Sequence, residues 1–171
     1  ALAMEKKGSS MRKDGDNDKA FKEASNVIEL DYEFPFLAHG AMEPLSFAAH
    51  HKDGEAILWS TAQSPTLAFA SAQKVLGVKA EDITYNTPYL GGAFGRRGAI
   101  NMDFVLDGLY VAKDEGYPIL TLWTREDDIK LGSYRPKYKN KVKLALDEHG
   151  DITAFNAKVV SQSIFKGSPF E

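Results

Sequence analysis

The sequence contains no cysteine among its 171 residues. This absence excludes disulfides, thiolate zinc sites, iron–sulfur ligation within the chain and a cysteine nucleophile. Long hydrophobic runs are also missing: none approaches the roughly 20 residues that a membrane-spanning helix needs, and no charged-then-apolar signal opens the chain. We therefore expect a soluble protein, and the missing cysteines leave its redox compartment open.

An excess of positive charge is lacking as well. The chain has 21 Lys and Arg against 24 Asp and Glu, for a formal net charge of −3. It therefore has no basic footprint of the kind that binds nucleic acid through phosphates, and we expect no nucleic-acid partner. With 43% hydrophobic residues, the chain is long enough for one domain with a core, or one domain with an appendage.

Residues 1–25 differ in composition from the rest of the chain. Six Lys and Arg and five Asp and Glu alternate there with Gly and Ser, and large apolar side chains are scarce. Such a segment has little surface to bury. We predict a linker or disordered leader over residues 1–25, with a short helix near Lys19 to Ala24, and a domain over residues 26–171.

Four segments have the residue pattern of β-strands or hairpins. "NVIELDYEFPF" predicts a strand that ends at Pro35, and "ILTLW" predicts a buried strand. Two β-like runs flank Asp53-Gly54, which is a strong hairpin signal, and a second long hairpin is predicted to turn at Asp147 to Gly150.

Two segments have the signals of the main helices. Ser64-Pro65 supplies an N-cap and a first-turn proline, apolar residues follow at helical spacing, and Gly77 ends the helix. A second helix is predicted over residues 101–115 and is expected to stop at Gly116. Thr124 with an aspartate three residues later has the pattern of a capping box. The predicted fold class is α+β, with mixed sheet hairpins and two main helices.

A glycine-rich loop, "TPYLGGAFGRRG" at residues 87–98, separates a strand-like run from the second helix. Such a loop brings backbone N–H groups close to a ligand, and Arg96 and Arg97 add positive charge, so an anion is the natural guest. The dinucleotide fingerprint fails because Ala93 stands at its first glycine, and the P-loop pattern is absent. The alternative is a tight turn that only lets a helix pack on a strand.

The histidines and a cluster of acids offer weaker candidates. His50 and His51 are neighbours on a predicted strand and point to opposite faces, so we predict no metal site. His39 and Glu43 are expected to be a satisfied interior polar pair. The acids of residues 126–128 are expected to complement a helix dipole, and we assign no catalytic residue.

Several short motifs in one unbroken order resemble a known family. They are "FLAHGAMEP", "QSP", "PYLGGAFGRR" and "LWTREDD...YRP". From about Asn26 to its end the chain resembles the molybdopterin-binding large subunit of the xanthine oxidase family. Within that family it is most similar to the bacterial branch of the isoquinoline oxidoreductase beta subunit and related aldehyde dehydrogenases.

The resemblance implies a molybdenum hydroxylase that oxidises aldehydes or N-heterocycles with oxygen taken from water. The cofactor would be a molybdenum–pyranopterin, in bacteria usually a cytosine dinucleotide, and a small [2Fe-2S] subunit would be a partner. The compartment would be bacterial cytoplasm or periplasm. The cofactor-binding residues implied by the motif are Gly91, Gly92, Ala93, Phe94, Gly95 and Arg96, with alanine at position 93 where this branch often has a third glycine.

The family's catalytic glutamate and later cofactor segments lie outside the matched motifs. We therefore expect an N-terminal-to-middle fragment of the large subunit, inactive alone, whose further partner is the rest of its own subunit. Two hypotheses from other classes stay open. One is a self-sufficient anion- or nucleotide-binding module that uses the glycine loop, and the other is a structural or interaction domain.

Overall fold

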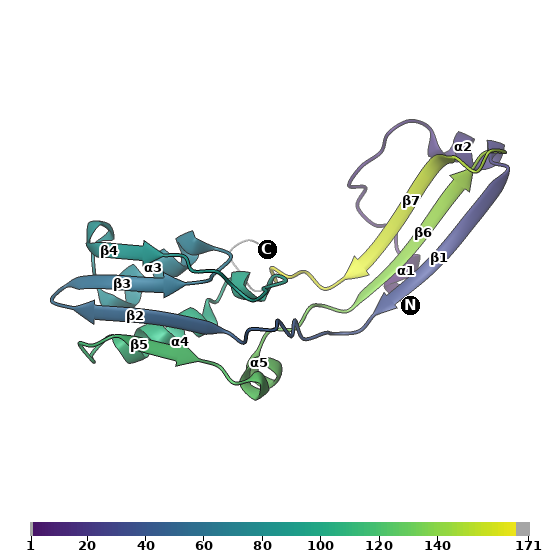
Figure 1. Ribbon diagram of the computed structural model, residues 1–171. Coiled ribbons are helices and arrows are strands. Elements are labelled where there is room, and N and C mark those ends of the chain that lie inside the picture. The colour runs from purple at the N-terminus through teal and green to yellow at the C-terminus, as the bar shows by residue number, and fades with distance from the viewer. Residues whose placement is uncertain (1, 167–171) are drawn as a thin grey trace. The chain divides into compact units, whose positions relative to one another are not determined.

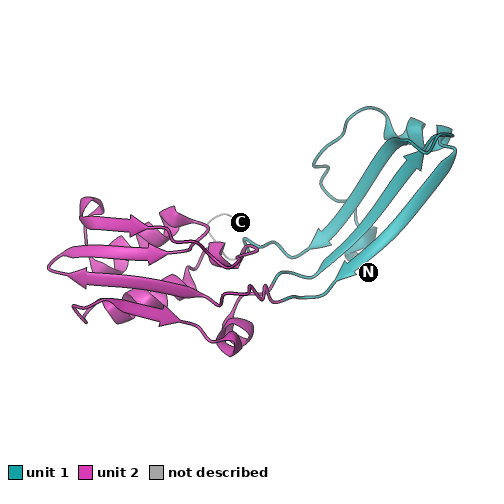
Figure 2. Cartoon of the chain, in the orientation of Figure 1, with its two compact units in different colours: residues 1–37, 135–171 teal, residues 38–134 magenta. Residues whose placement is uncertain are grey.

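The computed structural model describes residues 2–166 and divides into two compact units (Figure 2). Unit 1 comprises residues 1–37 and 135–171, and unit 2 comprises residues 38–134, so unit 2 is a continuous insertion within unit 1. Residues 1 and 167–171, which belong to the predicted leader and domain, lie outside the described residues. Neither unit begins at residue 26, and the boundary between leader and domain stays a prediction.

Unit 2 contains a four-stranded sheet in the order β4-β3-β2-β5 (Figure 1). The hairpin β2–β3 turns at Asp53-Gly54 as predicted, β2 pairs with β5 antiparallel, and β3 pairs with β4 in parallel. The strands are β2 (Ser46–Lys52), β3 (Glu55–Ser60), β4 (Ile83–Asn86) and β5 (Ile119–Leu122).

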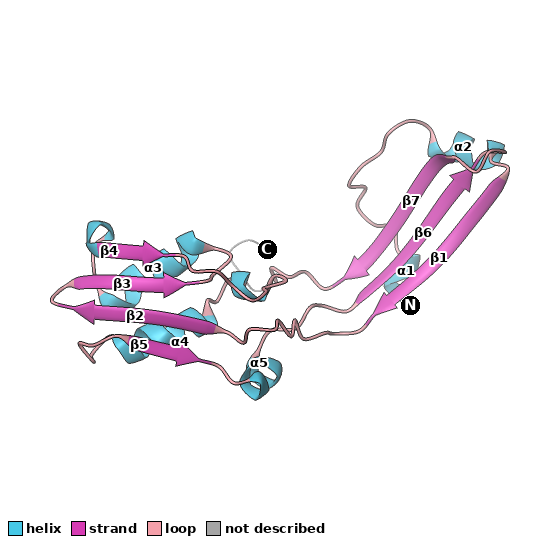
Figure 3. Cartoon of the chain, viewed as in Figure 1, coloured by secondary structure: helices cyan, strands magenta, loops and turns pink. Residues whose placement is uncertain are grey.

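Two helices of unit 2 lie against one face of this sheet (Figure 3). Helix α3 (Pro65–Leu76) joins the parallel strands β3 and β4, and it ends where Gly77 adopts the left-handed conformation with φ 73°. Helix α4 (Asp103–Ala112) leads from the glycine loop to β5. Both main helices are confirmed, because their apolar spacing is encoded in contiguous residues, although the Ser64 hydroxyl makes no cap bond to α3. The 3₁₀-helix η1 (Ala80–Asp82) precedes β4.

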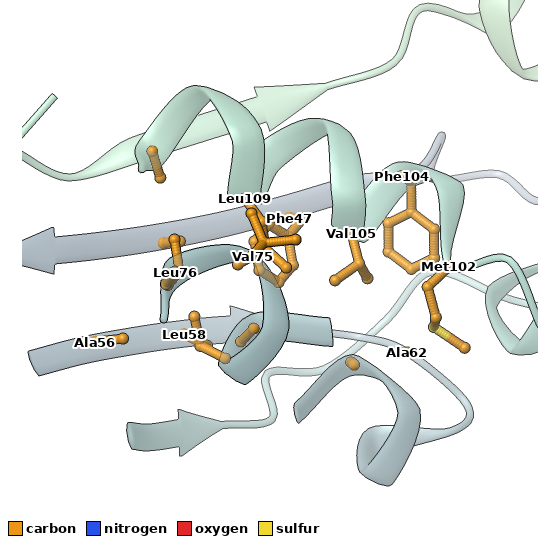
Figure 4. Packing of buried hydrophobic residues seen from close by; sticks show 14 of the residues in the cluster. Phe47, Ala56, Leu58, Ala62, Val75, Leu76, Met102, Phe104, Val105 and Leu109 are labelled. Atoms are coloured by element: carbon orange, nitrogen blue, oxygen red, sulfur yellow. The ribbon is translucent and has the colours of Figure 1, made fainter. Parts of the chain in front are cut away.

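The core of unit 2 lies between the helices and this sheet face (Figure 4). Strand alternation places Phe47 and Leu58 on the covered face, where they are buried, and Val105 and Leu109 of α4 complete the cluster. Gly108 lets α4 approach closely, because a Cβ there would lie 2.4 Å from Cδ1 of Phe47.

Strand β5 is more exposed than the sequence predicted. The run "ILTLW" was predicted to be buried, but Leu120 and Leu122 are 64% and 65% exposed. Strand β5 is at the edge of the sheet, and the helices cover only one of its faces. A short apolar run does not reveal whether one or both faces of its strand are covered.

Unit 1 contains a three-stranded antiparallel sheet in the order β1-β6-β7. The β6–β7 hairpin turns at Asp147 to Gly150 as predicted, with the Gly150 amide donating to the Asp147 carbonyl over 3.2 Å. The α+β fold class is thereby confirmed in both units. The remaining elements are β1 (Asn26–Phe34), β6 (Tyr138–Leu146), β7 (Ile152–Ser161), α1 (Leu2–Glu5), α2 (Asn17–Glu23) and α5 (Arg125–Leu131), the last in unit 2.

The two faces of the unit 1 sheet differ in chemistry. On one face Glu29 lies opposite Lys143, with their charged groups 2.8 Å apart. Helices α1 and α2 contact this charged face, where Lys143 lies over the Phe21 ring and Lys158 donates to carbonyls at the end of α1. The other face of the sheet carries mostly apolar side chains. That face, here named the apolar face, carries Ile28, Leu30, Tyr32, Phe34, Val142, Leu144, Phe155 and Val159.

We predict that Phe155→Thr will leave the folded state nearly as stable as the parent and will reduce self-association. Phe155 is on the apolar face and is 57% exposed, so its removal loses little burial while shrinking an exposed apolar patch. Thermal unfolding and light scattering measure the two effects. Ala154→Thr on the covered face is the matched control, because Ala154 is 6% exposed and should lose stability. A large loss of stability in Phe155→Thr would contradict the prediction.

Candidate functional site

The glycine loop joins β4 to α4 and ends in the 3₁₀-helix η2 (Arg96–Gly98). Three of its residues have positive φ angles: Gly92 at 103°, Phe94 at 53° and Gly95 at 100°. Gly91 is needed for space instead, because a Cβ there would lie 2.6 Å from Cβ of Glu43. The loop therefore needs its glycines for backbone conformation and for close approach.

Three consecutive amides of this loop have no acceptor within the described part of the chain: those of Gly92, Ala93 and Phe94. Their neighbours differ, since the Gly91 amide donates to Oε2 of Glu43 over 2.6 Å and the Gly95 amide donates to a Gln63 oxygen over 3.0 Å. The φ angle is positive at Gly92 and Phe94 but not at Ala93 between them. Alternating signs of φ occur in anion-binding nests, in which successive N–H groups converge on one point.

Arg97 lies beneath the loop, with no exposed side-chain surface. Its Nε donates to the Gly92 carbonyl over 3.2 Å, and its two terminal nitrogens bond the Thr61 hydroxyl and the carbonyls of Glu43 and Pro44. Nη2 also lies 3.2 Å from Oε2 of Glu43, which balances the charge. The guanidinium therefore supports the loop from inside instead of facing a ligand.

Arg96 is also buried, at 2% exposure. Its guanidinium makes a bidentate pair with Asp103 over 3.0 and 2.7 Å and lies 5.2 Å from the Trp123 ring centroid. Its Nε is 3.9 Å from Asp128, which also pairs with Arg125. The side chain thus links η2 to the starts of α4 and α5, and its assignment to the cofactor site stays a prediction.

Glu43 connects the loop to the segment before β2. Burial raises the pKa of its carboxyl group, but hydrogen bonds from the Gly91 amide and the Ser46 hydroxyl, together with the Arg97 charge, outweigh this effect. The pKa is consequently lowered from its ordinary value of 4.5. The ionised form of Glu43 is therefore the one that the folded loop selects.

We predict that Glu43→Gln will weaken the acid sensitivity of folding. A carboxyl whose pKa is lower in the folded state stabilises the protein above pH 4.5 and loses that contribution as the pH falls through the folded pKa. Melting temperatures of the parent and the variant, measured from pH 7 to about pH 3, should differ most at neutral pH and converge in acid. Glu29, Glu33 and Asp127 also have lowered pKa values, but they are present in both proteins and contribute equally to both curves. Parallel curves would therefore contradict the prediction.

The predicted loop residues lie together, but three partners of the loop were not identified as such from the sequence. Glu43 and Gln63 bond the loop from 48 and 32 residues away along the chain, and Arg97 holds it from within. No local pattern marks such partners; the only signal is that Glu43 and Gln63 stand in two of the other family-like motifs. The Glu43 carboxylate accepts from the Gly91 amide and the Ser46 hydroxyl and pairs with Arg97.

The acids of residues 126–128 lie in the first turn of α5, as expected. Asp127 closes a capping box with Thr124 at the start of α5, and Asp128 is buried against the two arginines. Within residues 2–166 the structure brings no three histidine or acidic side chains into a metal-binding group. His51 bonds the Lys113 carbonyl through Nδ1 over 2.7 Å. A membrane-spanning helix is likewise not found among the described residues.

Comparison with known proteins places this geometry in context. A family described as "Molybdopterin cofactor-binding domain" matches residues 3–164. The isoquinoline 1-oxidoreductase subunit beta of Brevundimonas diminuta is 32% identical over 139 residues, which cover 80% of this chain and 18% of the relative. The aldehyde oxidoreductase molybdenum-binding subunit PaoC of Escherichia coli (strain K12) is 28% identical over 155 residues, covering 91% of this chain and 21% of the relative.

Among solved structures, quinoline 2-oxidoreductase from Pseudomonas putida 86 is similar in fold. The TM-score is 0.64 at 18% sequence identity, and the match covers 84% of this chain and 18% of that chain. The chain thus spans about a fifth of the length of the relatives that it matches.

Proposed function

We propose that this chain, which belongs to the molybdopterin cofactor-binding domain family, is part of the large subunit of a molybdenum hydroxylase. That enzyme would oxidise aldehydes or N-heterocycles with oxygen taken from water. Relatives named as aldehyde and isoquinoline oxidoreductases support this substrate class. The chain spans only a short part of those proteins, and the apolar face of unit 1 is exposed. Both observations support the proposal that this chain is one part of a larger subunit, in which other segments cover that face.

The observation that carries the proposal is the row of amides at Gly92, Ala93 and Phe94 with no protein acceptor in the described chain. Such donors suit anionic or metal-bound oxygens, so the loop fits one side of a molybdenum–pyranopterin. We assign the shaping of this cradle to Gly91 and Gly95. Arg96 would act through its amide, which closes the turn on the Ala93 carbonyl over 2.9 Å.

When bound, the molybdenum centre supplies the redox chemistry and the activation of water. The chain itself would orient the group through the loop amides and would present Phe94, which is 65% exposed, toward it or its substrate. We further propose the cytosine dinucleotide form of the cofactor, and two partners, a small [2Fe-2S] subunit and the rest of the same subunit. We assign no catalytic acid or base to the described residues, and we expect the chain alone to be inactive.

Titration of the ¹⁵N-labelled chain with inorganic phosphate tests the cradle. Amide signals of Gly92, Ala93 and Phe94 should shift together, because their N–H groups gain an acceptor. The Gly54 amide, in the β2–β3 turn, is the control and should not move. If the three loop signals stay in place up to molar phosphate, the loop is a tight turn and the proposal loses its main support.

The self-sufficient nucleotide-binding module finds less support. That hypothesis relied on the charges of Arg96 and Arg97, and both guanidinium groups are buried and already paired with carboxylates. One loop with three amides offers few contacts to offset the ordering of a large ligand.

A further inference from the structure

The orientation of the three loop amides follows from the carbonyls that precede them. Each amide N–H shares a planar peptide unit with the carbonyl of the residue before it, and no peptide bond of the described chain is cis. In a trans peptide the C=O and N–H bonds point in opposite directions. A group that holds the carbonyl on one side therefore aims the amide to the other side.

All three preceding carbonyls are held by the protein. The Gly91 carbonyl accepts from the Glu43 amide over 3.2 Å, and the Ala93 carbonyl accepts from the Arg96 amide over 2.9 Å. The middle carbonyl, that of Gly92, accepts from Nε of Arg97 over 3.2 Å. Among the described residues it is the only one of the three carbonyls that is held by a side chain, so the direction of the Ala93 amide depends on Arg97.

The Arg97 side chain is built to keep its position. Its planar guanidinium is fixed at both terminal nitrogens, by Thr61 on one and by two carbonyls and the Glu43 carboxylate on the other. Glu43 is itself anchored by the Ser46 hydroxyl over 2.9 Å and by the Gly91 amide. A lysine has no rigid fork of donors and could not reproduce this set of bonds.

We infer that Arg97, with Glu43 as its ionic partner, is a positioning residue of the anion site: it holds the Gly92 carbonyl toward its own guanidinium and aims the Ala93 amide to the opposite side. The use of this amide in anion binding rests on the proposed function. The direction of the Ala93 N–H bond does not, and it can be tested without any cofactor.

The experiment measures N–H residual dipolar couplings of the ¹⁵N-labelled chain in the parent, Arg97→Lys and Thr61→Val. In Arg97→Lys the Ala93 coupling should change, while the couplings of α3 and α4 should stay the same. The apparent phosphate affinity of this variant should fall about tenfold, as for the loss of one hydrogen bond of a charged group. Thr61→Val removes a bond of Arg97 but leaves Nε and the Gly92 carbonyl, so it should lose stability and keep the parent's Ala93 coupling.

An unchanged Ala93 coupling in a folded Arg97→Lys protein would overturn the inference. If that variant does not fold, Glu43→Gln is measured in its place, because it removes the charge partner of Arg97. This variant should change the Ala93 coupling to a smaller extent. An unchanged Ala93 coupling in Glu43→Gln would also overturn the inference. A parent that shows the coupling pattern but no phosphate-induced shift would count against the proposed function and not against the positioning role.

Discussion

Gly108→Val is expected to lower the stability of unit 2 by about 3 kcal/mol, near the upper end for overpacking a core. A Cβ at this position would lie 2.4 Å from Cδ1 of Phe47 and 3.1 Å from the Thr121 hydroxyl. Phe47 is only 2% exposed and packs in the centre of the core, so it has no free space to enter. The few tenths of a kcal/mol that a helix gains on losing a glycine are too small to offset this clash.

Urea and thermal unfolding followed by circular dichroism measure this effect, and a midpoint lowered by about 10 to 20 °C is expected from the size of the unit. Gly8→Val is the matched control, since a Cβ at Gly8 would meet no atom within 4 Å. Equal midpoints for Gly108→Val and the parent would mean that α4 can move away from β2, and that the packing of this helix is looser than the structure indicates.

Gly95→Val is expected to abolish anion binding by the glycine loop while the fold persists. Space is available, because the nearest atom to a Cβ is Nε2 of His39 at 3.8 Å. The obstacle is the φ angle of 100°, which a β-branched residue does not adopt without strain of about 1–3 kcal/mol. The loop should relieve this strain by rotating its peptides, which would disperse the amides of Gly92, Ala93 and Phe94.

Phe94→Ala is the matched control for this loop, because it keeps the amide at position 94 and removes an exposed ring. Phosphate-induced shifts should disappear in Gly95→Val and persist in Phe94→Ala, with circular dichroism close to the parent in both. In the longer subunit that we propose, Gly95→Val should lose molybdenum, whereas Phe94→Ala should keep it and change turnover or substrate selection. A Gly95→Val protein that binds phosphate like the parent would show that the loop conformation does not matter for binding.

Features encoded in contiguous residues were predictable. Helix α3 begins at its proline and ends at its glycine, as expected. The Asp53-Gly54 hairpin turn and the capping box of Thr124 and Asp127 also form as expected. Each depends on backbone preferences or on a hydrogen bond that spans only a few residues. The same holds for the glycine loop itself, whose positive φ angles at Gly92 and Gly95 require residues without a Cβ.

The division into two units could not be read from local patterns. It arises because β1 pairs with β6 across the inserted residues 38–134, from Asn26 opposite Leu146 to Phe34 opposite Tyr138. The alternating residues of β1 predict a strand but do not name its partner. Nor does the alternation say which face will be covered, and in unit 1 the described helices contact the charged face.

The sequence by itself determined the α+β class, the turn-forming loop and, through its motifs, the molybdopterin cofactor-binding family. Only the tertiary structure decided what the two arginines do. Positive charge beside a glycine loop suggests an anion ligand, but the direction of a long side chain depends on partners that are distant in sequence. Here Asp103 and Asp128 take the guanidinium of Arg96, and Glu43 and Thr61 take that of Arg97. Burying either charge without such partners would cost several kcal/mol, so packing turns both arginines inward, and the anion site that we propose depends on the loop amides instead of the arginine charges.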